Sequence, residues 1–133
     1  MGTNYYFHSD KKCASCGREV EGVHIGKSSG GWCFSLHIMP EERISTWSDW
    51  LDMFANYKDS YIKDEYGSVV AKDEFICIVT ERKWKSTRTM NVDELRRNSA
   101  EPGPNGLLRH LVDGRHCVGH GEGTYDYCVG YFS

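Results

Sequence analysis

The stretch HIGKSSGGWCFSLH, residues 24–37, decides how the N-terminal part of the chain folds. In WCFSLHI, residues 32–38, large apolar side chains alternate with smaller or polar ones, which is the period of a β-strand with one buried face. The small residues of SSGG supply the turn of a hairpin. We therefore predict strands over 22–26 and 32–38, in a register that places His24 opposite Ser35.

The GKSSGG core also resembles part of a phosphate-binding loop, whose pattern is GxxxxGK[ST] between a strand and a helix. In such a loop, backbone N–H groups and the helix dipole meet the phosphate. Here the spacing from Gly22 to Gly26 is one residue short, and the strand-like WCFSLH stands where the helix is required. We therefore expect no nucleotide at this stretch.

A metal site is the second chemistry that this region suggests. Cys13 and Cys16 form a CxxC pair, which lets two thiolates approach one ion at tetrahedral angles. In the predicted register His24, Cys33 and His37 share one face of the sheet. We predict a structural zinc ion held by Cys13, Cys16, His24 and His37, with Cys33 as the alternative to either histidine. The competing interpretation is a turn with reduced thiols and two ordinary sheet histidines.

The rest of the chain alternates between helical and strand patterns. Apolar residues at 47, 50, 51 and 54 mark one helix face, and Thr46 with Asp49 suits a capping box in which Asp replaces the usual Glu. The segment 72–83 has helical spacing, although its β-branched content leaves a strand open. The other predicted elements are a strand at 3–8, two strands around Gly67, a short helix in 91–99 and β-hairpins after 106.

Length and composition predict one α+β domain. The chain has 133 residues, a usual length for one domain, of which 39% are hydrophobic and 26% are charged. We divide it into a zinc-hairpin part at 1–40, a helical and hairpin part at 41–100 and a C-terminal β part at 101–133. The predicted fold is α+β, with a zinc-stapled (zinc-ribbon-like) N-terminal β-hairpin packed with two or three helices and C-terminal β-hairpins.

Nothing in the sequence predicts a secreted or membrane protein. No apolar run approaches the ~20 residues that span a bilayer, and MGTNYYFHSDKK lacks a basic segment followed by an apolar one. We expect a cytoplasmic protein whose thiols stay reduced, which favours a metal or redox pair over a structural disulfide. The net charge of −3 argues against nucleic-acid binding by the surface as a whole.

Two further groups of residues are candidates for binding. His116 and His120 lie four residues apart in a Gly-rich segment and would bind a second metal ion, or form a hydrolytic centre together with an aspartate. A glycine-rich hairpin with solvent-facing histidines is the simpler explanation. The second group is a basic stretch that suits single-stranded nucleic acid or an acidic protein surface, unless it is only a solvated face. Its residues are Arg82, Lys83, Trp84, Lys85 and Arg88.

Four motifs together carry a resemblance to a known family. They are CxxCGR, HIGKSSGGWCFSLH, IKDEYG and a C-terminal GTYDYxVGxFS. This pattern resembles a family of small proteins encoded by tailed bacteriophages. The resemblance covers most of the chain, and HIGKSSGGW is its most specific part. It implies an accessory protein made in the cytoplasm of an infected bacterium, and it implies no particular reaction.

The motifs favour a binding protein over an enzyme. No nucleophile and base stand at a recognisable spacing, and no paired carboxylates lie in an apolar setting. We expect a zinc-binding phage accessory protein that binds a host protein stoichiometrically, to redirect host machinery or to inhibit an antiviral defence. The alternatives are a nucleic-acid-binding factor that uses the 82–97 stretch, and a metal-dependent hydrolase that uses His116, His120 and an aspartate.

Overall fold

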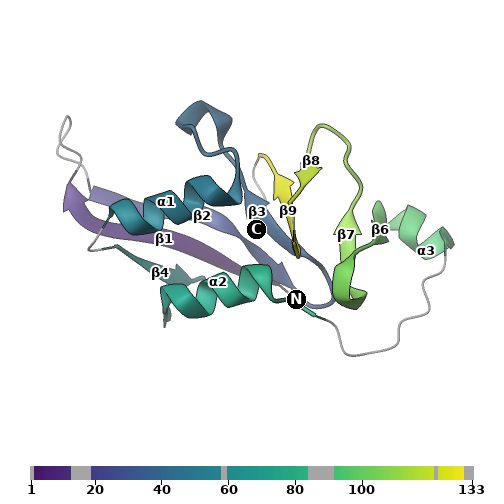
Figure 1. The fold of residues 1–133 in the computed structure, drawn as a ribbon, viewed down its shortest axis with the longest axis horizontal. Coiled ribbons are helices and arrows are strands. Elements are labelled where there is room, and N and C mark those ends of the chain that lie inside the picture. The colour runs from purple at the N-terminus through teal and green to yellow at the C-terminus, as the bar shows by residue number, and fades with distance from the viewer. Residues whose placement is uncertain (1, 13–18, 58–59, 84–91, 122, 131–133) are drawn as a thin grey trace.

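The computed structural model describes residues 2–12, 19–57, 60–83, 92–121 and 123–130. A seven-stranded mixed sheet has the strand order β5-β4-β1-β2-β3-β9-β8, and a two-stranded sheet pairs β6 with β7 (Figure 1). The α+β prediction is confirmed. The strands are β1 (Gly2–Lys12), β2 (Glu19–Ser29), β3 (Phe34–His37), β4 (Ser60–Asp64), β5 (Val69–Val70), β6 (Ala100–Pro102), β7 (Leu108–His110), β8 (Cys117–His120) and β9 (Tyr125–Cys128). The helices are α1 (Trp47–Asn56), α2 (Lys72–Thr80), α3 (Val92–Arg97) and the 3-10 turns η1 (Pro40–Glu42) and η2 (Pro104–Gly106).

Local signals place the helices correctly. The Thr46 hydroxyl accepts a hydrogen bond from the Asp49 N–H, and the Asp49 carboxylate accepts one from the Thr46 N–H, which completes the predicted capping box of α1. Ala71 gives α2 no side-chain cap. The segment is nevertheless helical because Phe75 and Val79, four residues apart, are both fully buried.

The core lies between one face of the large sheet and helices α1 and α2, which Figure 1 shows side by side across that face. Trp50 is fully buried and its indole N–H donates to the His37 carbonyl at 2.8 Å, so α1 is tied to the end of β3. Rings of Phe54 and Phe75 meet edge to face between the two helices. The core residues are Tyr5, Phe7, Ile25, Phe34, Leu36, Ile44, Trp47, Trp50, Phe54, Ile62, Phe75, Val79 and Tyr125.

The register of the β2–β3 pair differs from the prediction. The partners are Gly26 with Leu36 and Lys27 with Ser35, so the predicted pairing of His24 with Ser35 is wrong by three residues. A wider turn, held by contacts from distant segments, separates the strands. The Cys33 N–H donates to the Leu108 carbonyl at 2.7 Å, and the Leu108 N–H donates to the Gly31 carbonyl at 2.7 Å.

The C-terminal third contributes to the large sheet. Strands β8 and β9 form the predicted antiparallel hairpin, and β9 also pairs with β3 in parallel, with Ser35 opposite Asp126. The EPGPNG segment, which reads as a breaker in the sequence, is the turn of the β6–β7 hairpin. The large sheet therefore takes strands from all three parts into which the sequence was divided. Among the described residues, no helix has the length and apolar character that crossing a membrane requires.

Candidate functional site

His24 and His37 lie together on the sheet face opposite the helices. Their Nδ1 atoms are 3.2 Å apart, and the His24 Nε2 atom lies 2.9 Å from the Asn4 side-chain oxygen. Burial, followed by the neighbouring His37 and Lys27 charges, lowers the pKa of His24 to about 4. Burial also lowers the pKa of His37. Both imidazoles are therefore neutral at pH 7, the state in which a histidine nitrogen can bind a metal ion.

The structure brings two of the predicted zinc ligands together and separates a third. Cys33 is four residues from His37, about 13 Å along an extended chain, and its buried thiol packs against Gly103. Cys13 and Cys16 lie outside the described residues. Within the ranges that the structure describes, no three His, Cys, Asp or Glu side chains converge to hold a metal ion. The four-ligand site stays a prediction.

The predicted basic stretch begins with an arginine that has an internal role. The Arg82 guanidinium donates to the Trp32 carbonyl at 3.0 Å, to the Ser28 hydroxyl at 2.8 Å and to the Ser29 carbonyl at 2.8 Å. Arg82 therefore holds the GKSSGGW turn in place. Lys83 is exposed. Trp84, Lys85 and Arg88 lie outside the described residues, so nucleic-acid binding by this stretch stays a prediction.

The C-terminal histidines surround a buried carboxylate. Asp126 is fully buried, and its two oxygens accept hydrogen bonds from the Arg109 side chain at 2.9 Å and from the His110 N–H at 3.0 Å. The His120 Nε2 atom lies 2.7 Å from the His110 carbonyl oxygen, so it is protonated and donates there. That nitrogen is then not free for a metal ion. The His116 ring meets the His110 ring edge to face.

Groups that could act as nucleophiles near this cluster are buried. The His110 Nε2 atom is 3.3 Å from the Ser35 hydroxyl, but Ser35 is buried and Asp126 contacts the backbone of His110 rather than its ring. Cys117 and Cys128 are fully buried, and burial raises the pKa of both thiols. These thiols therefore stay protonated and unreactive at neutral pH. The cluster is better explained as a polar core between the two sheets.

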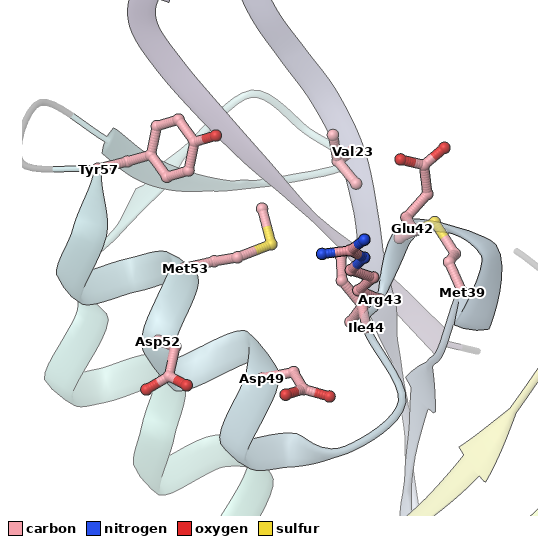
Figure 2. Close-up of a pocket in the computed structure, with 9 residues that line it drawn as sticks. All are labelled: Val23, Met39, Glu42, Arg43, Ile44, Asp49, Asp52, Met53 and Tyr57. Carbon is pink, nitrogen blue, oxygen red and sulfur yellow. The ribbon is translucent and has the colours of Figure 1, made fainter.

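An open groove lies on the helix side of the large sheet, and the sequence analysis did not find it. Its volume is about 650 Å³. In Figure 2, residues of α1 line one side, the turn that follows β3 lines the other, and Val23 of β2 lies at the back. The lining residues are Val23, Met39, Glu42, Arg43, Ile44, Asp49, Asp52, Met53 and Tyr57.

The groove combines an apolar surface with acidic walls. Met53 of α1 and Tyr57, the residue that follows α1, project toward Val23, and Ile44 closes the end nearest the turn (Figure 2). Three carboxylates and one guanidinium line it, so its net charge is negative. A sequence feature that bears on it is Pro40, which stands three residues after the end of β3 and begins η1.

The chain was compared with protein-family models, with curated proteins and with solved structures. No family model matches it, and no curated protein or solved structure matches it either.

Proposed function

We propose that this protein is a phage accessory factor that binds a host protein stoichiometrically in the cytoplasm of an infected bacterium. Its partner would be a component of host machinery that the phage redirects, or of an antiviral defence that it inhibits. The observation that carries the proposal is the groove between α1 and the turn after β3. The phage resemblance of the HIGKSSGGW motif supplies the compartment and the expectation of a host partner.

The shape of the groove supports binding to a protein segment. Its volume of about 650 Å³ suits several side chains of a partner. Met53 and Tyr57 offer the flexible and aromatic apolar surface that is common where proteins meet. The acidic walls would select a partner that carries lysine or arginine there.

A zinc ion is the second part of the proposal. Two nitrogens bound to one tetrahedral zinc ion lie about 3.4 Å apart, and the Nδ1 atoms of His24 and His37 are separated by 3.2 Å. The pair has the spacing for one ion, which Cys13 and Cys16 would complete once the His37 Nδ1 atom gives up its proton and its hydrogen bond to the His24 carbonyl. The role would be structural, because the ion would join β2 to β3.

Affinity capture from host cells tests the partner. The tagged protein is compared with Glu42→Lys/Asp52→Lys, which reverses two groove charges, and with Asp73→Lys/Glu94→Lys, which reverses two exposed acids on α2 and α3. We expect one host protein with wild type and control, and its loss with the groove variant. The captured protein, once purified, should form a 1:1 complex in multi-angle light scattering. Capture that is absent, or unchanged by the groove substitutions, would contradict the proposal.

A further inference from the structure

One edge of β2 has no strand beside it along half of its length. On one side β2 pairs with β1 from Glu19 to Ser29. On the other side β3 pairs with it only at Gly26 and Lys27. Within the part of the chain that the structure describes, no strand lies beside residues 19–25 on that edge, although the His24 carbonyl accepts a hydrogen bond from the His37 ring. Such an edge carries N–H and C=O groups able to pair with another extended chain.

No strand lies beside this half of β2 because the chain leaves the sheet directly after β3. The Ile38 N–H donates to the Cys128 carbonyl at 2.9 Å, so this end of β3 stays paired with β9, whereas the pairing of β3 with β2 ends at Leu36. Met39 then pairs with Ile44 across a tight turn that contains Pro40 and the left-handed Arg43. The His37 ring still contacts β2, with its Nδ1 atom 3.2 Å from the His24 carbonyl oxygen.

If a strand continued beside residues 19–25 of β2, its helix-facing side chains would lie in the groove. Val23 belongs to this edge of β2. Met53 of α1 and Tyr57, which follows α1, lie over it, and Met39 and Ile44 close the end where β3 departs (Figure 2). Side chains of an added strand would point alternately into this space and away from it. The edge of β2 at residues 19–25 and the groove therefore form one site. The edge would supply main-chain pairing, and the groove would supply an apolar pocket.

Charge decides which segment would fit. Of the groove acids, Asp49 already accepts hydrogen bonds from the N–H groups of Ser45 and Thr46. Glu42 and Asp52 are exposed on opposite walls, so they would meet lysine or arginine residues that flank an apolar centre. A segment with acidic flanks would be repelled.

We infer that an extended segment of the partner, with an apolar centre flanked by lysine or arginine, adds to β2 as a further strand in this groove. The inference rests on the proposed function, since it names how the host protein is held. In this mode main-chain hydrogen bonds supply affinity, and the pocket supplies specificity.

A capped synthetic peptide, KKVIVKK, tests the inference on the full-length protein by NMR and amide hydrogen exchange. We expect saturable shifts for amides of residues 22–25 and slower exchange of amides along residues 19–25. The matched peptide EEVIVEE should bind roughly tenfold more weakly or worse. Asp52→Lys should weaken binding of KKVIVKK, and Asp73→Lys on α2 should not.

Backbone methylation separates strand pairing from simple burial. A strand pairs through alternate residues, so methylating the isoleucine nitrogen blocks one peptide edge and methylating both valine nitrogens blocks the other. We expect one methylated peptide to lose binding and the other to keep it. Equal effects of the two modifications, or no binding at residues 19–25, would overturn the inference.

Other occupants give different results. Amides of residues 19–25 already protected in the free monomer would show that the chain itself covers this edge, and a groove-dependent dimer in sedimentation would show a second copy there. Either result overturns the inference. If a host protein is still captured through the groove but no peptide pairs with β2, the strand addition is wrong and the proposed function is retained.

Discussion

The Nδ1 atoms of His24 and His37 lie 3.2 Å apart, on a face of the sheet that no described helix covers. At that distance one neutral ring donates its N–H and the other accepts it, whereas two charged rings would repel. Burial is the main reason that the pKa values of both rings are lowered. The folded protein therefore keeps both rings neutral. Because protonation is unfavourable in the folded state, acid should lower the stability of the fold.

The first prediction is that acid destabilises the protein through this pair. His24 has a folded pKa of about 4 against an ordinary value of 6.5, so the unfolded chain binds more protons between these values. Stability should be fully present above pH 6.5 and should fall as the pH drops toward 4. The part due to His24 should be on the order of 1 kcal/mol, because partial exposure reduces the effect. Urea denaturation from pH 4 to 7 in the presence of a chelator measures it.

A pair of variants identifies the source of this slope. His24→Gln keeps a partner for Asn4 and removes the titrating ring, so stability should depend less on pH between 4 and 6.5. His8→Gln changes a histidine that stacks on Tyr61 outside the pair, and it should retain the wild-type slope. An unchanged slope in His24→Gln would assign the acid sensitivity to other groups.

The second prediction concerns zinc. The last β1–β2 pair before the cysteine segment is Lys12 with Glu19, and His24 lies five residues further along β2, about 16 Å away. A single ion shared by cysteines and histidines requires the 13–18 segment to turn back over that distance. If it does, elemental analysis should find one zinc ion per chain, lost both in Cys13→Ser/Cys16→Ser and in His24→Gln/His37→Gln.

The two variants also separate the alternatives. Zinc that is lost only with the cysteines would place a separate ion at the hairpin tip and leave the histidines as a hydrogen-bonded pair. A protein that binds no zinc in either form, and that melts as cooperatively as one supplied with the metal, would remove zinc from the proposal.

Elements with local signals were predictable, and pairings set by distant residues were not. Thr46 and Asp49 are three residues apart, so the start of α1 is visible in the sequence. The β2–β3 register was wrong because residues far along the chain, Arg82 and Leu108, hold the turn between the strands. His24 and His37 meet in spite of that error because β2 is irregular at Ile25. Tyr5 pairs with Gly26 and Tyr6 with His24, so the extra residue Ile25 returns His24 to the face of His37, which the three-residue shift alone would not do.

The groove shows the same limit. Pro40 marks the end of β3, and the amphipathic pattern marks α1, so both walls were visible separately. Nothing local shows that β2 continues past the point where β3 leaves it, because the partner of that half of β2 is β1. The open position beside β2 results from two pairings together, that of β2 with β1 and that of β2 with β3. A single sequence does not reveal either extent.

The third prediction is that Arg82 stabilises the turn that carries the GKSSGG motif. Its guanidinium donates three hydrogen bonds to residues of the turn, two of them to backbone carbonyls. Arg82→Ala removes these three hydrogen bonds, although the Ser29 carbonyl still accepts one from the Trp32 N–H, and it should cost about 2–3 kcal/mol of unfolding free energy, as measured by urea denaturation. Arg82→Lys should recover only part, because one ammonium cannot reach all three acceptors. Lys83→Ala is the matched control, since Lys83 is exposed; an equal loss there would contradict the assignment.

The last prediction concerns Asp126, the buried carboxylate that joins β9 to β7. It forms an ion pair with Arg109 at 2.9 Å and accepts the His110 N–H at 3.0 Å. Removing one partner of a buried ion pair strands the other, so Asp126→Ala should cost about 3–5 kcal/mol, and Asp126→Asn should cost less because an amide oxygen still accepts one bond. Asp52→Ala, at an exposed position, should stay within about 0.5 kcal/mol of wild type. Because a partly buried Arg109 charge is the cause of the loss, Arg109→Met should partly rescue Asp126→Ala. If the loss of unfolding free energy in the double variant equals the sum of the losses in the two single variants, the pair contributes through packing alone.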